Sequence, residues 1–164
     1  MSLKTQDLFD VSNKVVVVTG GSRGIGEMIT SGFLANNSKV YITARKEEAL
    51  VKKAEELSQK YSCECIPVSG DISNSEGIDA LVNFLNDAEP EGIDFLINNA
   101  GAAWGANYDD FPESGWDKVI DLNLKTPFFL TQKLTPLLEK KGTTEDPSRA
   151  VSYTHLTLPT MRTV

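Results

Sequence analysis

The sequence predicts an α/β protein with a doubly wound parallel β-sheet of about four to five strands. Short runs of β-branched residues alternate along the chain with longer stretches of helical periodicity. The first run contains four consecutive valines at residues 15–18, as expected of a strand covered by helices on both faces. Strands that alternate with helices are joined by right-handed crossovers, which make neighbouring strands parallel.

The predicted elements follow one another in regular order. Strands are expected at residues 14–19, 39–43, 64–68 and 93–97, which are rich in Val, Ile and aromatic residues. Helices are expected at residues 24–35, 46–59, 73–86 and from 114 or 115 to 140. Ser73 and Ser75 are the expected caps of the third helix, with Glu76 three residues after Ser73. No repeat or low-complexity linker interrupts the 164 residues, which suit one domain.

Charge and composition exclude several classes of partner. The net charge of -7, with basic residues scattered among acids, argues against a nucleic-acid or anionic-membrane surface. No apolar run approaches the roughly 20 residues of a membrane span, and the N-terminus lacks a secretory pattern, so we expect a cytoplasmic protein. Cys63 and Cys65 are expected to be free thiols, because no other cysteine is present and His155 is distant; no metal site is expected.

A glycine-rich turn follows the first predicted strand. The stretch Thr-Gly-Gly-Ser-Arg-Gly-Ile-Gly has glycines spaced G-x-x-x-G-x-G at Gly20, Gly24 and Gly26, between a buried strand and a helix. Glycines in this position let a pyrophosphate approach the backbone, where the N–H groups of the helix N-terminus hold it. The spacing and its context therefore predict a dinucleotide site rather than a merely structural turn.

Together with this turn, three further motifs make the sequence resemble the short-chain dehydrogenase/reductase family over roughly residues 11–149. Asn-Asn-Ala-Gly at residues 98–101 follows the fourth strand, Asp71 ends the third, and Asn123 lies on the long helix. The resemblance implies the N-terminal half of a Rossmann-type fold, in which Asp71 contacts the adenine ring. The cofactor-binding residues that it implies are Gly20, Ser22, Arg23, Gly24, Ile25, Gly26, Arg45, Asp71, Ile72, Asn99, Ala100 and Gly101. Residues 103–105, 115–119 and 145–149 resemble the 3-oxoacyl-(acyl carrier protein) reductases of rhamnolipid biosynthesis within this family.

The residues after the second strand indicate which cofactor is preferred. An NAD site places an acid there to hold the ribose 2′-hydroxyl, whereas this chain has Ala44 followed by Arg45. Arg45 and Arg23 together offer two guanidinium groups to a 2′-phosphate, with no carboxylate to repel it. The sequence therefore predicts NADP(H).

Asn123 lies on the apolar stripe of the long helix, where an amide is costly to bury without a partner. Pro127 has no N–H, so the Asn123 carbonyl lacks its helical donor and is free to hold a water molecule. In the family this residue binds a water that links to the catalytic lysine in a proton relay. The alternative is a kinked core helix with a satisfied amide.

Trp104 and Trp116 either line a fatty-acyl pocket or pack within their loop.

The resemblance ends after Arg149. The family continues with a fifth strand, a catalytic Ser and a Tyr-x-x-x-Lys helix, but here Tyr153 is followed four residues later by Thr157. Tyr153 also follows the long helix too closely for a strand to intervene, and Ser152 with His155 makes only a weak hydrolase motif. We therefore expect an incomplete NADP-binding domain at residues 1–149 and a non-family tail at 150–164. The tail resembles a translated sequencing adapter, with a truncating splice variant as the alternative.

The resemblance implies an NADPH-dependent oxidoreductase that reduces a small-molecule carbonyl or acyl-thioester substrate, such as a 3-oxoacyl thioester, by hydride transfer. The chain as given lacks the Ser and the Tyr-x-x-x-Lys motif, so we expect it to be inactive. The alternative is a non-catalytic NADP-binding module. The resemblance also implies that the full-length parent is a homo-oligomer, because family members usually associate through the long helix present here and through the Tyr-x-x-x-Lys helix, which is missing.

Overall fold

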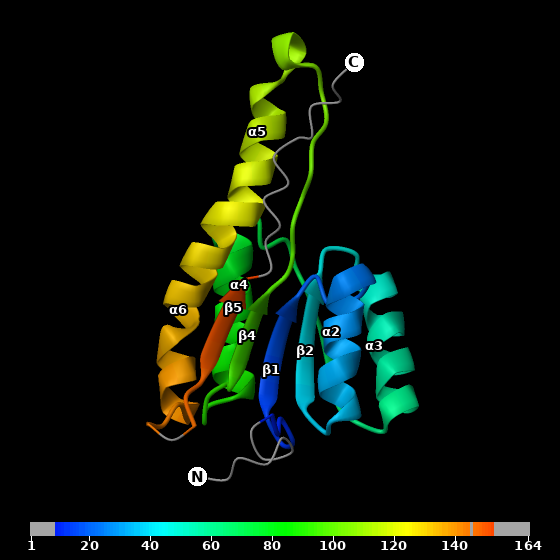
Figure 1. The fold of residues 1–164 in the computed structure, drawn as a ribbon, viewed down its shortest axis with the longest axis vertical. Coiled ribbons are helices and arrows are strands. Elements are labelled where there is room, and N and C mark those ends of the chain that lie inside the picture. The colour runs from blue at the N-terminus through cyan, green and yellow to red at the C-terminus, as the bar shows by residue number, and fades with distance from the viewer. Residues whose placement is uncertain (1–8, 145, 153–164) are drawn as a thin grey trace.

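The computed structural model describes residues 9–144 and 146–152, which form a five-stranded parallel sheet flanked by helices (Figure 1). The strand order is β3-β2-β1-β4-β5, so the chain winds from β1 to one edge and then returns to extend the other. The elements are β1 Val15–Thr19, α2 Gly24–Ala35, β2 Lys39–Ala44, α3 Glu47–Tyr61, β3 Cys65–Ser69, α4 Ser75–Ala88, β4 Phe95–Asn98, α5 Glu113–Ile120, α6 Thr126–Lys141 and β5 Arg149–Ser152. The predicted α/β class and doubly wound sheet are confirmed.

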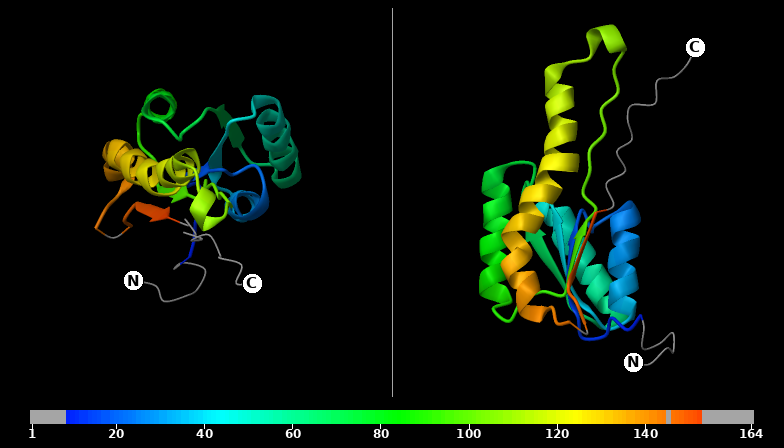
Figure 2. Two further views of the ribbon diagram at one scale, coloured as in Figure 1. Left: turned by 90° about the horizontal axis from the view of Figure 1, so that it is seen from above. Right: turned by 60° about the vertical axis from the view of Figure 1, so that its left-hand side comes forward.

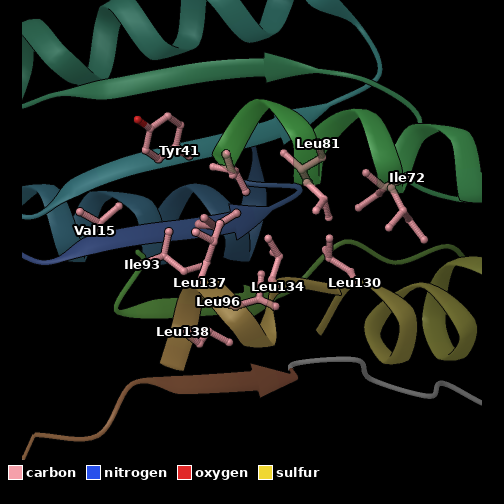
Figure 3. Close-up of a cluster of buried hydrophobic side chains, with 14 residues drawn as sticks. Val15, Tyr41, Ile72, Leu81, Ile93, Leu96, Leu130, Leu134, Leu137 and Leu138 are labelled. Atoms are coloured by element: carbon pink, nitrogen blue, oxygen red, sulfur yellow. The ribbon is translucent and has the colours of Figure 1, made fainter. Parts of the chain in front are cut away.

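Two hydrophobic layers sandwich the sheet, with α2 and α3 on one face and α4 and α6 on the other (Figure 2). The valines of β1 alternate between them: Val15 and Val17 face α4 and α6, whereas Val16 and Val18 face α2 and α3. Figure 3 shows the layer between the sheet and helices α4 and α6. In it, leucines of α6, among them Leu134 and Leu137, pack in one cluster with Leu81 of α4. This two-sided burial explains why the strand is continuously apolar rather than alternating.

The long helix predicted from about residue 114 to 140 has a single irregular turn. Helices α5 and α6 are joined without a break by a π-helical turn, η2, at Asp121–Lys125. In this turn the Thr126 N–H donates to the Asp121 carbonyl, five residues back. Pro127 comes next and has no N–H, so the wider turn lets the helix accommodate a residue that cannot donate.

Two sequence-based expectations about the elements are wrong. A strand does intervene between the long helix and Tyr153, because β5 pairs with β4 and aligns Arg149 with Phe95. The expected boundary between residues 149 and 150 therefore falls inside a strand. The cap of α4 is neither Ser73 nor Ser75 but Asn74, whose side-chain oxygen accepts a 2.9 Å hydrogen bond from the Gly77 N–H.

The remaining features of the fold concern its thiols and its helices. Cys63 and Cys65 are free thiols, half-buried and buried respectively. Within the described residues, no helix has the length and apolar character needed to span a membrane. Tyr153, His155 and Thr157 lie outside the described residues.

Candidate functional site: a nucleotide cavity at the carboxyl ends of the strands

A cavity of about 570 Å³ opens at the carboxyl ends of β1, β2 and β4, where the winding direction of the sheet reverses. Both its position and its volume are typical of cofactor sites in open α/β sheets. Eleven of the twelve expected cofactor-binding residues line it, and Gly24 lies in the same turn. The cavity is lined by Gly20, Ser22, Arg23, Ile25, Gly26, Thr43, Ala44, Arg45, Lys46, Ala49, Lys53, Gly70, Asp71, Ile72, Asn99, Ala100, Gly101 and Leu122.

The glycine turn between β1 and α2 forms one wall of the cavity. Gly20 and Gly24 have φ angles of +67° and +55°, a region that side chains disfavour. Gly26 meets a steric requirement instead, because a Cβ atom on it would lie 2.1 Å from the Gly20 carbonyl oxygen. The turn therefore folds tightly onto the first turn of α2, and Gly20 and Gly26 present only backbone to the cavity. This is the surface that a pyrophosphate needs.

Hydrogen bonds fasten this turn to the end of β4. The Thr19 hydroxyl accepts from the backbone N–H groups of Asn99 and Ala100, at 3.0 and 2.9 Å. The Asn99 side-chain amide donates to the carbonyls of Thr19 and Gly20, at 2.9 and 3.3 Å. Asn99 thus fixes the glycine turn through its amide while it also lines the cavity. The Asn-Asn-Ala-Gly motif and the glycine turn are parts of one structure.

The charges that line the cavity are mostly positive. Arg23, Arg45, Lys46 and Lys53 supply four cations, and among the described lining residues Asp71 is the sole acid. The predicted acid-free position at the end of β2 is occupied by Ala44, which lines the cavity next to Arg45. We call the surface formed by Arg23, Arg45, Lys46 and Lys53 the cationic wall. A dianionic phosphate would meet strong attraction and little repulsion there.

Asp71 ends β3 and begins the loop to α4. Its Oδ1 atom accepts hydrogen bonds from the backbone N–H and the hydroxyl of Ser73, at 3.1 and 2.7 Å. Partial burial opposes ionisation of this carboxyl group, but the hydrogen bonds from Ser73 and the attraction of Arg45 together hold its pKa below the ordinary value. Asp71 is therefore a fixed, ionised acceptor at the edge of the cavity.

Asn123 lies in the π-helical turn, buried and close to the cavity without lining it. Its side-chain oxygen accepts from the Ala102 N–H at 2.8 Å, and its amide donates to the Ala102 carbonyl at 2.9 Å. The amide is thus satisfied by the loop that follows β4. Because the Thr126 N–H donates to Asp121 and Pro127 has no N–H, the Asn123 carbonyl lacks its i+4 donor, as the sequence predicts.

The two tryptophans do not line the cavity. The Trp104 ring packs against Gly115, where a Cβ atom would lie 2.6 Å from the ring, and Lys118 sits 5.0 Å above it. Trp104 therefore joins its loop to α5, which favours the loop-packing interpretation. The Trp116 side chain is 61% exposed.

Sequence reasoning missed three lining residues on the approach to α3 and within it: Lys46, Ala49 and Lys53. Ala49 and Lys53 are four residues apart and so share one face of α3, and Lys46 directly precedes the helix. That pattern, combined with the position of Arg45 directly before it, is a signal that would have found them.

The residues present fit a nicotinamide dinucleotide phosphate. A glycine turn with two left-handed glycines suits the pyrophosphate, and the cations that line the cavity together with Ala44 suit an additional phosphate on the ribose. The arrangement supplies binding and orientation. Neither Asp71 nor Lys53 is suited to donate a proton at neutral pH, because the pKa of Asp71 is lowered and the pKa of Lys53 is raised.

Comparison with known proteins finds oxidoreductases among the relatives of this chain. A 3-oxoacyl-(acyl carrier protein) reductase of rhamnolipid biosynthesis from Pseudomonas aeruginosa is 40% identical over 144 residues, which are 88% of this chain and 55% of that protein. An uncharacterized oxidoreductase of Staphylococcus aureus is 33% identical over 128 residues, covering 78% of this chain and 54% of the relative.

Solved structures agree in fold. The P. aeruginosa RhlG/NADP active-site complex matches with a TM-score of 0.83 and 39% identity, over 88% of this chain and 55% of that one. L-Sorbose reductase from Gluconobacter frateurii, complexed with NADPH and L-sorbose, matches with a TM-score of 0.77 and 29% identity, over 82% and 51%.

The chain thus spans about half the length of the relatives that it matches. Residues 14–145 match the family described as short chain dehydrogenase. Because this match covers most of the chain and agrees with the glycine turn, the Asn-Asn-Ala-Gly motif and the sheet order, the protein belongs to the short-chain dehydrogenase/reductase family.

Proposed function

We propose that this chain is the NADP(H)-binding half of an oxidoreductase that reduces a carbonyl group, with 3-oxoacyl thioesters as the substrate class. The observation that carries the cofactor preference is that Arg23 and Arg45 line the cavity together with Ala44, which stands in place of an acid. The substrate class is supported by similarity to the P. aeruginosa 3-oxoacyl reductase alone.

When bound, NADPH supplies the hydride for such a reaction. The residues of this chain bind and orient it: the glycine turn faces the pyrophosphate, Arg23 and Arg45 hold the 2′-phosphate, and Asp71 faces the adenine. Asn123 positions the loop that carries Ala102, and its carbonyl is free of an i+4 donor to hold a relay water.

The test of cofactor preference is a titration of the chain with NADPH and NADH. We expect NADPH to bind more tightly by about 1–2 kcal/mol, the usual gain from charge-assisted hydrogen bonds. Arg45→Ala should remove most of this preference, whereas Lys52→Ala should leave it, because Lys52 is an exposed cation that does not line the cavity. Equal affinity of the unaltered chain for the two nucleotides would refute the proposal.

We also propose that these 164 residues alone do not reduce a carbonyl substrate. None of the four tyrosines, Tyr41, Tyr61, Tyr108 and Tyr153, is followed four residues later by lysine. Loss of a general acid costs about 100- to 10,000-fold in rate. NADPH oxidation with an acetoacetyl thioester should therefore be undetectable, and turnover that Tyr153→Phe abolishes would contradict this. Binding without turnover is also what a non-catalytic NADP-binding module would show.

Self-association of the longer protein is proposed to use the outer face of α6 and the π-helical turn. Leu124 and Phe128 lie there and are 56% and 63% exposed. Such contiguous apolar exposure marks contact surfaces. Light scattering of the longer protein and of its Phe128→Glu variant tests this: the substitution should reduce the mass of the assembly, and an unchanged mass would contradict the proposal.

A further inference from the structure

A carboxylate and a lysine form an ion pair between the two helices next to the cavity. Glu27 is in the first turn of α2, and Lys53 is on the neighbouring helix α3 (Figure 1). The Lys53 Nζ atom lies 3.1 Å from the Glu27 Oε1 atom and 2.9 Å from the Glu56 Oε2 atom. Of these three residues only Lys53 lines the cavity, so its ammonium group is paired with carboxylates of residues that are not part of the lining.

The position of Lys53 on α3 allows it to reach toward Arg45. Helical side chains lean toward the N-terminus of their helix, which for α3 is the end adjoining Arg45 and Lys46. Ala49, one turn nearer to that end, also lines the cavity and offers only a methyl group. Within α3 itself, therefore, no large lining residue stands between Lys53 and the end of the helix that adjoins Arg45.

We propose that Lys53 is a specificity-determining residue that transfers from Glu27 to the 2′-phosphate when NADP(H) binds. This inference rests on the proposed function, since it requires the 2′-phosphate to lie on the cationic wall. It adds a third ligand to the two arginines that the sequence indicates.

The exchange of partners is favourable for two reasons. The 2′-phosphate carries close to two negative charges, whereas each carboxylate carries one. Glu27 also tolerates the loss of its lysine, because a negative charge in the first turn of a helix is stabilised by the helix dipole. The hydrogen bonds with Glu56 and Glu27 raise the pKa of Lys53, so the side chain is a cation throughout the physiological range.

The experiment compares two probes that differ only by the phosphate in question, adenosine 2′,5′-bisphosphate and adenosine 5′-monophosphate. Each is titrated calorimetrically against the 164-residue chain and its variants. Lys53→Met should weaken binding of the bisphosphate by about tenfold, the scale of one charge-assisted contact, and leave the monophosphate unchanged. Lys52→Met is the matched control, because it removes the same charge from an exposed neighbouring position.

The Glu27→Gln variant distinguishes two possible roles of Lys53: a ligand of the 2′-phosphate, or only the cation that neutralises Glu27. If Lys53 binds the phosphate, Glu27→Gln should tighten bisphosphate binding severalfold, because it frees the ammonium, and should have no effect once Lys53 is Met. If instead the double variant returns to the affinity of the unaltered chain, Lys53 only neutralises Glu27 and the inference is overturned.

A separate outcome concerns the proposed function itself. If the unaltered chain does not prefer the bisphosphate, the NADP(H) assignment fails and this inference fails with it. If that preference is present and Lys53→Met retains it in full, only the role of Lys53 is refuted. Circular dichroism of each variant identifies any loss of binding that is caused by unfolding, and the Glu27→Gln result then decides.

Discussion

Gly26 and Gly32 lie in the same helix, α2, and substitution of each by alanine should shift stability in opposite directions. At Gly26 a Cβ atom would lie 2.1 Å from the Gly20 carbonyl oxygen and 2.5 Å from the Asn99 amide. Backbone must move to relieve the first contact, at a cost of about 1–3 kcal/mol. Displacement of the Asn99 amide loses about 1 kcal/mol more. The higher helix propensity of alanine compared with glycine offsets about 1 kcal/mol of this loss.

The net expectation for Gly26→Ala is a decrease of about 1–3 kcal/mol in the free energy of unfolding. At Gly32 no atom other than those of its chain neighbours and the backbone of α2 lies within 4 Å of an added Cβ, so Gly32→Ala should increase the free energy of unfolding by about 0.5–1 kcal/mol. Urea midpoints followed by far-ultraviolet circular dichroism measure both, and the direction of each shift is readable even in a broad transition. Gly26→Ala should also lose adenosine 2′,5′-bisphosphate binding. A stabilised Gly26→Ala variant that retains nucleotide binding would refute the close-approach argument.

Three further predictions follow from buried groups. Asn123→Ala removes two hydrogen bonds to the loop after β4 and should lower the free energy of unfolding by about 2–3 kcal/mol in urea titrations. Burial, followed by a hydrogen bond to a carboxylate, raises the pKa of Tyr41 from 10.0 to about 12. Because the raised value belongs to the folded state, this contribution to stability is complete below pH 10 and lost between about pH 10 and 12. Tyr41→Phe should flatten that part of the pH profile of the unfolding midpoint. Iodoacetamide should modify the half-buried Cys63 and spare Cys65, whose pKa burial raises to about 12, as peptide mass spectrometry would show.

Elements with a strong local pattern could be predicted from the sequence within about two residues. Helix α2 was predicted at residues 24–35 and occupies Gly24–Ala35, because its glycine turn and apolar period define both ends locally. Strand β5 could not be predicted in this way. Arg149 and Ala150 are exposed and Val151 is only half-buried, so the segment carries no burial pattern. It becomes a strand because the edge of β4 supplies hydrogen-bond partners, a non-local cause that periodicity does not contain.

The cavity was predicted in outline because its residues belong to motifs. Gly20, Arg23 and Arg45 are adjacent to strand ends, and all such ends meet at one edge of a parallel sheet. Lys53 was missed because it lies eight residues beyond Arg45, inside a helix rich in Lys and Glu. In the sequence, such a mixture of charges indicates only a face exposed to solvent. Its role at the wall depends on how α3 packs beside α2, which the spacing within one helix does not determine.

The hydrogen bonds between Thr19 and Asn99 have a consequence for how the protein folds during its synthesis. Its partners are 80 residues apart in the chain, so the glycine turn cannot acquire its final shape while only the first strand and helix have been synthesised. The ribosome must release residues as far as the end of β4 before β1 can pair with it and Asn99 can dock. Closing so long a loop is entropically slow relative to forming helices α2 and α3. Nucleotide capture by a nascent chain would therefore begin abruptly once Asn99 has left the ribosome, and chains stalled with Asn99 inside or outside the exit tunnel would report when the sheet first closes.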